Sequence, residues 1–456
     1  MKEFDSLSFK KPTRITTAYK KSHSRVKLNL PNAKSKMTAV APFVFILLSL
    51  LLLTVAIHQS LPFQFLLLSR SLLNQSFLIG FQNSAELRPT GGFWGSFALL
   101  DIGTSSSHPQ LNFDTNPYKL DNKLKSESGV NLPEPMQQMW PDAKQSFVNA
   151  NWSADFPEAA QTLEWYIGQG WGDKRISGVV AVSSLSMIDL LKLTGPVQVD
   201  ETEINSANFT RIMSERIDHD YWQNEENKTI NEPKTIIKNL FLEISKKVEA
   251  VPKIKIAGFF YKQLASGKIL VYFNDPVKQR LISTLRFTGE ILPYKRDYLL
   301  INNANISGGK TSLNVSQRIA YEVSCNDEQT TSQLAITRRH EDLWPHQINT
   351  NYTRVYVPLG STLKSCKLGV DDITDKVTVT QESGHSVFGF WFSTKNGQIK
   401  TAYLEYQLPT MTSSTPYQLL WQFQPGTLSD LVNLKINDKM VFDGTVSERF
   451  RLFKSF

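Results

Sequence analysis

The feature that most constrains this chain is an uncharged run of 21 residues, Met37 to Ile57, whose centre reads FVFILLSLLLL. A helix needs about 20 apolar residues to cross a hydrocarbon core of about 30 Å, so the run is long enough to span a membrane. The residues after it, 57–62, offer no small-residue cleavage site of the kind that ends a signal peptide. The sequence therefore predicts one uncleaved transmembrane helix over 37–57.

The net charge of the chain is concentrated before this run. Residues 1–36 hold ten lysines and arginines against two acidic residues, and this excess of eight equals the net charge of the whole chain. Because residues 37–456 are electrically balanced, the charge indicates a positive-inside tail and not nucleic-acid binding. We expect a disordered basic cytoplasmic tail over 1–36, a single-pass protein in the cell membrane, and most of the chain on the extracytoplasmic side.

Helical and strand patterns alternate after a membrane-proximal helix or linker at 58–75, which predicts a layered α/β domain over 76–303. The stretch 103–144 is rich in Ser, Asn, Pro and Lys, and is expected to be a long surface loop. Strands are expected at 76–82, 93–102, 177–182, 197–199, 268–273 and 298–302. Helices are expected at 155–168, 184–193, 206–218, 233–249 and 276–286.

The pattern changes past Asn303, where apolar and polar residues alternate in short runs separated by Gly, Asn and Ser. Strands that bury one face show this alternation, so residues 304–456 are predicted to form an immunoglobulin-like β-sandwich. The expected strands are 318–325, 332–338, 353–358, 376–380, 386–394 and 401–408.

The chain has two cysteines, Cys325 and Cys366. In an oxidising compartment they could form a disulfide that closes a loop of about 40 residues and stabilises the fold by roughly 3–4 kcal/mol. The alternative is two buried thiols on adjacent strands. The histidines and cysteines show no metal-ligand spacing, so no metal site and no cofactor are predicted.

The densest polar motif, residues 83–93, lies between two predicted buried strands, where α/β domains commonly bind ligands. Arg88 offers a planar fork for phosphate or carboxylate, and a glycine pair permits close backbone approach. Glu86 could be a base, a metal ligand, or the partner that fixes Arg88 in a tight turn. The ligand-binding candidates in this motif are Asn83, Glu86, Arg88, Thr90, Gly91 and Gly92.

A second cluster, residues 149–157, adds Trp152 and Asp155 to the ligand-binding candidates. Trp152 is interpreted either as a core side chain or as a platform for a sugar ring. Asp155 is well placed to cap the helix that begins after it, which is the structural alternative to a ligand contact.

Four strings in order identify a family resemblance: QNSAELRPTGGFWGSFALLDI, NANWSADFP, ISGVVAVSSLSMIDLLKLTGPVQV and LLINNANISGGKTSLNVSQRIAYEVS. They resemble the bacterial envelope family catalogued as domain of unknown function 4012, over about residues 76–400. The resemblance implies a membrane-anchored envelope protein and carries no established activity.

A fainter resemblance connects the turn around Arg88 and the later GVVAVSSLSMIDLLKLTGPVQV to the LytR-CpsA-Psr family. It implies an α/β fold and transfer of glycopolymers from a polyprenyl-pyrophosphate carrier, with arginines on the pyrophosphate and aspartates on magnesium. Arg88 can stand for the first of these arginines. Where that family has Arg-Ser-Asp after the glycine pair, however, this chain has Phe93, Trp94 and Gly95.

The sequence therefore favours an extracytoplasmic envelope protein that binds a cell-wall glycan or a lipid-linked glycan precursor through residues 83–93, with membrane lipid as a further partner. Non-catalytic binding is favoured, because Phe93 and Gly95 replace the charges that pyrophosphate transfer needs. One alternative is a divergent, magnesium-dependent glycopolymer phosphotransferase. Another is an adhesin that uses the β-sandwich.

Overall fold

The computed structural model describes residues 72, 74–102, 110–114, 117–124, 132–144, 146–171, 175–218, 220–224, 235–326, 329–343, 345–409, 417–446 and 448–454. These residues belong to one compact unit that extends from residue 68 to 456. The predicted tail 1–36, the predicted span 37–57 and nearly all of the linker 58–75 lie outside the described residues. No helix in the described part of the chain is long and apolar enough to cross a membrane.

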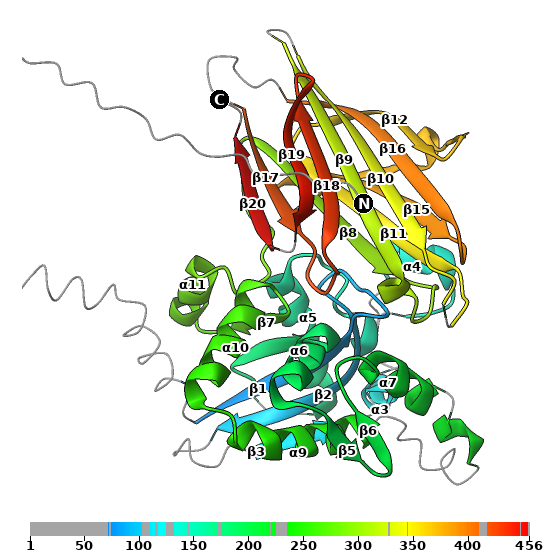
Figure 1. The fold of residues 1–456 in the computed structure, drawn as a ribbon. Helices are drawn as coiled ribbons and strands as arrows, with labels where there is room; N and C mark the ends of the chain where they lie inside the picture. Colours follow the sequence, from blue (N-terminus) through cyan, green and yellow to red (C-terminus); the bar gives the residue numbers. More distant parts are fainter. Residues whose placement is uncertain are drawn as a thin grey trace, which may run out of the picture. The chain divides into compact units, whose positions relative to one another are not determined.

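A mixed five-stranded sheet forms the centre of the first part of this unit (Figure 1). Its strand order is β3-β2-β1-β4-β7; β1 and β4 are parallel, and the other neighbours are antiparallel. Since each strand alternates its side chains between two faces, the sheet needs cover on both. The strands are β1 (Gln75–Asn83), β2 (Phe93–Ile102), β3 (Gln110–Asp114), β4 (Gly178–Ser183) and β7 (Ile269–Phe273).

Helices cover both faces of this sheet. On one face α5 (Phe156–Trp171) packs Leu163 and Ile167 against Leu78 and Val179, together with α3 (Tyr118–Leu124) and η1 (Phe147–Asn149). The other face carries a series of helices, of which α6, α7 and α9 share a core with the small β5-β6 hairpin (Val197–Val199, Thr202–Ile204). The helices of this face are α6 (Ser184–Thr194), α7 (Phe209–Asp218), α9 (Thr235–Glu249), α10 (Lys253–Ala265) and α11 (Pro276–Thr284).

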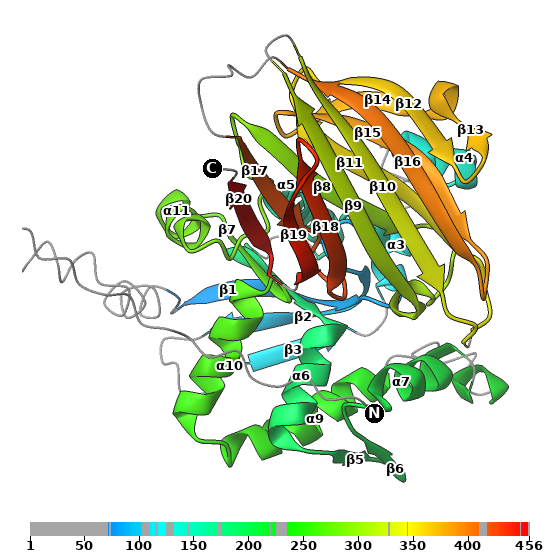
Figure 2. The same cartoon turned by 45° about the horizontal axis from the view of Figure 1, so that its top comes forward.

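Two sheets packed face to face form the second part, and they share one large apolar core (Figure 2). The seven-stranded sheet has the order β13-β12-β16-β10-β9-β18-β19, and the six-stranded sheet has the order β14-β15-β11-β8-β17-β20. Pairing is antiparallel except between β8 and β17 and between β9 and β18. The strands are β8 (Asp297–Asn305), β9 (Val315–Cys325), β10 (Thr330–His340), β11 (Asn349–Pro358), β12 (Thr362–Leu368), β13 (Asp371–Asp372), β14 (Thr378–Glu382), β15 (His385–Thr394), β16 (Ile399–Leu408), β17 (Gln418–Phe423), β18 (Asp430–Ile436), β19 (Lys439–Val446) and β20 (Phe450–Lys454).

The order of helices and strands largely follows the sequence-based expectation, with three differences. The strand expected at 298–302 is β8, which lies inside the sandwich between β11 and β17 and does not extend the α/β sheet. The expected loop 103–144 contains β3, α3 and α4 (Glu134–Met139). Helix α10 and the strands β6, β12, β13 and β17–β20 have no counterpart among the predicted elements.

The disulfide considered for Cys325 and Cys366 does not form, and both thiols are free. Cys325 ends β9 and Cys366 lies in β12, and the strands β10 and β16 separate them in the sheet. Neighbouring strands are about 4.8 Å apart, so the two residues are at least about 14 Å apart, beyond the reach of a disulfide. The thiols are therefore not on adjacent strands either. Cys366 is buried in the sandwich core, and burial raises its pKa to about 12.

Candidate ligand-binding site

The polar motif 83–93 is a tight, hydrogen-bonded turn between β1 and β2. The Phe93 amide donates to the Glu86 carbonyl at 2.9 Å, and the Gly91 amide donates to the Arg88 carbonyl at 2.9 Å. Arg88 is only 2% exposed. Its guanidinium donates to the Asn305 carbonyl of β8 and, at 3.1 Å, to the Glu86 carboxylate. The structural alternative, a Glu–Arg pair that locks a turn, is thus what the structure contains.

Side chains of the sandwich complete the contacts of this turn. Asn302 donates to the Pro89 carbonyl at 2.9 Å, and Gln424 donates to the Arg88 carbonyl at 3.1 Å. The Asn305 amide also donates to the Leu87 carbonyl at 2.8 Å. Because buried polar groups need partners, this bonding fixes the α/β part to the sandwich.

The glycine pair allows close backbone packing at the same junction between the α/β part and the sandwich. Gly91 has φ of 121°, and a Cβ there would lie 3.2 Å from the carbonyl carbon of Pro425. At Gly92 a Cβ would lie 2.6 Å from the carbonyl carbon of Asn83. The buried Thr90 hydroxyl accepts a hydrogen bond from Asn151 at 2.9 Å and donates one to the side-chain oxygen of Gln82 at 2.7 Å. Thr90, Gly91 and Gly92 therefore hold backbone segments together.

Trp152 and Asp155 also have structural roles. Trp152 packs against Tyr352, with ring centroids 6.1 Å apart, and its carbonyl accepts a hydrogen bond from Arg354 at 2.8 Å. The Asp155 carboxylate accepts from the Glu158 amide at 3.4 Å, as a helix cap does, and from the Ile291 amide at 2.9 Å. Burial raises the pKa of Asp155 to about 6.

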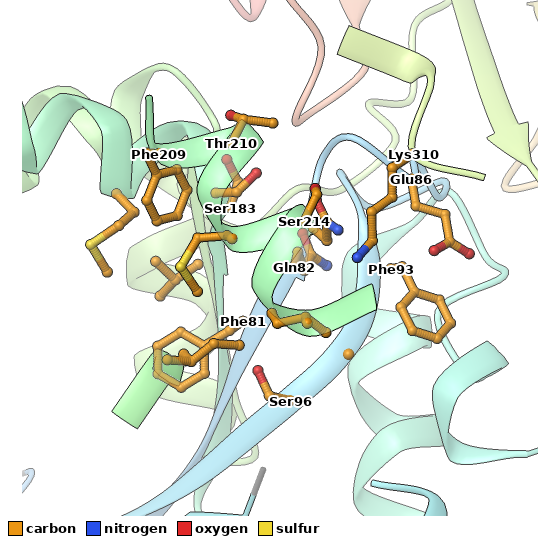
Figure 3. Close-up of a pocket in the computed structure, with 18 of the residues that line it drawn as sticks. Phe81, Gln82, Glu86, Phe93, Ser96, Ser183, Phe209, Thr210, Ser214 and Lys310 are labelled. Atoms are coloured by element: carbon orange, nitrogen blue, oxygen red, sulfur yellow. The ribbon is translucent and has the colours of Figure 1, made fainter. Parts of the chain in front are cut away.

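A cavity of about 290 Å³ lies on the other side of the same turn, between the sheet and α6, α7 and α9 (Figure 3). Its walls are mainly apolar side chains from β1, β2, β4 and these three helices. Phe81 also contacts Phe113 of β3 and Phe241 of α9, with centroids 5.7 Å and 6.4 Å away, which makes that wall continuous. The apolar lining residues are Phe81, Phe93, Val182, Met187, Phe209, Met213, Ile217, Ile237 and Leu240.

Polar groups gather at one rim of this cavity. Figure 3 shows Glu86 and Lys310 there, close to Phe93, while Ser183 and Ser214 lie toward the helices. Lys310 comes from the loop after β8, so the sandwich supplies a cation to a cavity built by the α/β part. An apolar interior with a few polar groups at one end is typical of sites for small amphipathic ligands.

The cavity includes two of the predicted site residues, Asn83 and Glu86. It does not include Arg88, Thr90, Gly91, Gly92, Trp152 or Asp155. Sequence reasoning missed the apolar walls, although Phe209, Met213 and Ile217 recur at the spacing of one helical face. That spacing alone is equally typical of a helix packed into a core.

A smaller, polar cavity of about 190 Å³ lies on the sandwich side of the turn, beside Ser84 and Leu87. It is lined by two buried charged residues, Arg338 and Asp430. Arg338 donates to the Thr353 hydroxyl at 2.9 Å, and burial lowers its pKa to about 9. Burial raises the pKa of Asp430 to about 7, although hydrogen bonding by Gln317 opposes the change.

No group of three or more His, Cys, Asp and Glu side chains in the described part of the chain is placed to hold a metal ion. Arg88, the residue considered for phosphate binding, is engaged by Glu86 and Asn305 and faces the junction instead of the cavity. The cavity can therefore bind an apolar chain and contact a polar head group.

Comparison with known proteins finds a family match over part of the chain. Residues 74–217 match the family described as "Protein of unknown function (DUF4012)", which confirms the resemblance predicted from the sequence over that region. The matched segment includes the turn 83–93 and most of the cavity walls, namely those from β1, β2, β4, α6 and α7. No curated protein matches the chain.

Similarities to solved structures are slight. They include leukotriene A4 hydrolase of Saccharomyces cerevisiae, at TM-score 0.20 and 7% identity over 31% of this chain and 29% of that one. They also include the M1 zinc metallopeptidase of Deinococcus radiodurans, at 0.14 and 10% over 26% and 32%. Aminopeptidase A of Legionella pneumophila matches at 0.15 and 10% over 27% and 16%. The chain thus spans a third or less of these proteins, and similarities at this level carry no argument.

Proposed function

We propose that this chain, whose residues 74–217 belong to the family of proteins of unknown function DUF4012, is a membrane-anchored extracytoplasmic binding protein for a lipid-linked glycan precursor. The observation that carries the proposal is the apolar cavity of about 290 Å³ with its polar rim. In this proposal the cavity takes part of the lipid chain, and the glycan end stays at the rim and outside it.

The lining of the cavity supports a lipid chain as the bound group. Transfer of apolar surface from water to an apolar wall contributes roughly 25 cal/mol for each Å² buried, and neither partner needs to be charged. The electrically balanced exported region also favours recognition by local groups over long-range attraction. The predicted transmembrane span at 37–57 would keep the cavity close to the membrane in which such a ligand resides.

The rim supports a ligand whose lipid chain ends in a polar or phosphorylated group. Lys310 provides a positive charge there, and the Glu86 carboxylate provides a hydrogen-bond acceptor. Glu86 also binds Arg88, with 23% of its side chain exposed, so it is oriented before a ligand arrives. Oriented polar groups beside an apolar interior would select an amphipathic ligand over a purely apolar one.

The geometry of the site favours binding without catalysis. A LytR-CpsA-Psr-like phosphotransferase would need arginine and carboxylate groups arranged around pyrophosphate and magnesium. Arg88, the arginine that resemblance assigns to this role, is 2% exposed and bonded to Glu86. The finer fold interpretation, LytR-CpsA-Psr-like for the α/β part and immunoglobulin-like for the sandwich, remains part of the proposal.

The proposal is tested by filling the cavity. The chain beginning at residue 68 forms a compact unit with its own apolar cores. It is titrated with farnesyl phosphate, a short and soluble polyprenyl phosphate, in a calorimeter. Met187→Trp and Ile237→Trp place a large ring at the half-buried wall positions, and we expect each to weaken binding at least about tenfold because the ring occupies the site.

The matched control is Met440→Trp, since Met440 is 52% exposed on β19 of the sandwich and lies away from the cavity. This variant should bind like the unmodified chain, and thermal unfolding should show that all three variants are folded. Absence of farnesyl phosphate binding to the unmodified chain, or unchanged affinity in both cavity variants, would overturn the proposal.

A further inference from the structure

Helix α10 exposes apolar side chains that a helix of a soluble domain normally buries. Of its 13 residues only Gln263 is buried. Ile254 is 79% exposed, Tyr261 is 62% exposed and Phe260 is 49% exposed. A surface helix usually turns its apolar side chains toward the core, so these side chains indicate a surface that contacts something else.

The exposed residues of α10 form an ordered stripe. Ile254, Gly258, Tyr261 and Ala265 recur at the spacing of one helical face, opposite the face that carries the buried Gln263. Lys255 and Lys262 flank this stripe on one side, and Lys253 flanks it on the other. An apolar stripe between lysines is the pattern of helices that lie in a membrane interface.

The charge of this region fits an anionic surface. Helix α10 has three lysines and no acidic residue. With α9, which precedes it, the segment Thr235–Ala265 has six lysines against two glutamates, and one of these, Glu243, pairs with Lys246 at 2.6 Å. The rest of the exported chain is close to neutral, so this excess of positive charge is local.

Helix α10 lies near the place where the chain enters the compact unit from its N-terminal side. Leu264 of α10 and Leu72 pack against the same apolar cluster, which contains Phe77 and Phe273. Figure 2 shows α10 beside the start of β1. The predicted span ends at Ile57, and 14 residues separate it from Leu72. Even a fully extended chain of that length reaches only about 50 Å.

We propose that α10 lies in the interface of an anionic lipid bilayer, with Ile254 and Tyr261 inserted at the headgroup boundary and its three lysines against lipid phosphates. Two inserted side chains bind weakly by themselves. A tether to the same membrane raises the effective concentration of the surface, so a weak contact becomes persistent. Since α9 lines the apolar cavity and leads into α10, the contact would also place that cavity beside the bilayer.

The experiment measures binding of the chain beginning at residue 68 to vesicles, by flotation and by hydrogen–deuterium exchange of peptides that cover α10. We expect binding to phosphatidylcholine vesicles that contain phosphatidylglycerol, and slower exchange in α10 when they are present. Phosphatidylcholine vesicles alone should bind far less. Replacing Lys253, Lys255 and Lys262 by Gln should weaken binding about fivefold for each lysine.

The apolar contribution is tested with Ile254→Gln and Tyr261→Gln together, which should reduce vesicle binding at least about tenfold. The matched control is Ile399→Gln and Tyr403→Gln, since this pair has the same residue types and its side chains are 63% and 52% exposed, but it lies on β16 of the sandwich. The control should bind vesicles like the unmodified chain. Equal binding by both double variants would overturn the proposal.

Two other binding partners for the stripe would change hydrogen–deuterium exchange in different ways, and finding either would overturn the proposal. A second copy of the chain would slow exchange in α10 without lipid, increasingly so at higher protein concentration. The segment before residue 68 would slow it in the full chain in detergent but not in the shorter chain without lipid. Met187→Trp should leave vesicle binding unchanged, so failure of the cavity proposal is distinguishable from failure of this one.

Discussion

The two sides of the turn 83–93 differ in almost every physical respect. Toward the sandwich, the buried Arg88 donates to Asn305 of β8, its carbonyl accepts from Gln424, and Gly91 lies close to the backbone of Pro425 and Gly426. Toward the helices, Asn83 and Glu86 border a cavity whose walls are mostly apolar. The side with the arginine and the glycine pair connects the α/β part to the sandwich. The side with the apolar residues has room for a ligand.

The types of residue in a turn therefore do not show whether it forms an interface between two parts of the fold or a ligand-binding site. An arginine beside a glycine pair suits phosphate binding, but the same donors satisfy backbone carbonyls when another layer of the protein covers them. What decides between the two uses is whether a neighbouring element occupies the space, and that element can lie far away in sequence. Here it is Asn305, more than 200 residues later.

The largest effect on stability is expected at Arg88. Arg88→Ala should lower the free energy of unfolding by about 3 kcal/mol, because it leaves the Asn305 carbonyl unpaired and opens a void at the junction. Denaturant unfolding of the chain beginning at residue 68 measures this change. The control is Arg211→Ala, since Arg211 is 61% exposed and pairs only across one helical turn with Glu215, which should cost less than about 1 kcal/mol. A similar free energy of unfolding in both variants would show that the turn does not hold the α/β part and the sandwich together.

The second prediction concerns pH and the polar cavity on the sandwich side. The raised pKa of Asp430, about 7, means that the folded chain holds this proton more tightly than the unfolded chain, whose aspartates titrate near 4. Its stabilising effect is therefore complete below about pH 4 and is lost as pH rises to about 7, by about 1.4 kcal/mol for each pH unit.

Asp430→Asn should remove that part of the pH dependence. Denaturant unfolding at several pH values, compared between this variant and the unmodified chain, isolates the contribution of one carboxyl group. The buried Asp297, whose pKa burial also raises to about 7, is present in both chains and cancels in the comparison. Parallel stability curves for the two chains would show that Asp430 is ionised in the folded state.

The smallest effect is expected at the cavity rim. Lys310→Gln should weaken farnesyl phosphate binding about fivefold, as expected for loss of one partly solvated contact to phosphate, and should leave stability nearly unchanged. Binding of farnesol, which lacks the phosphate, should not change. An equal loss for both ligands would place Lys310 in the structure of the wall and not at the head-group end.

Much of the fold follows from periodicity in the sequence. Helices α5, α6, α7 and α9 and strands β1, β2, β4 and β7 lie within a few residues of their predicted ranges. Helix α10 was missed because its apolar residues do not face the core, so the pattern that marks a buried face is absent. The strand β8 was found but placed in the wrong sheet, because all nine of its residues are buried and a buried run does not specify its neighbours.

The candidate site was predicted only in part. The position of the turn at the end of two strands follows from local pattern, and Asn83 and Glu86 do border the cavity. Which side of the turn would be covered depends on contacts with Asn302, Asn305 and Gln424, which lie more than 200 residues later. Such pairings have no local signature, so the roles of Arg88, Gly91 and Gly92 could not be read from spacing.

The placement of β8 decides where the chain can be divided for expression. The α/β part leads directly into this strand, which forms the middle of one sandwich sheet and is bonded to β11 on one side and β17 on the other. A cut at the sequence-based boundary after residue 303 would separate seven of the nine buried residues of this strand from both neighbouring strands, and would expose unpaired strand edges that favour aggregation. The natural dividing point precedes Asp297, so the sandwich begins before the pattern of alternating strands becomes visible in the sequence.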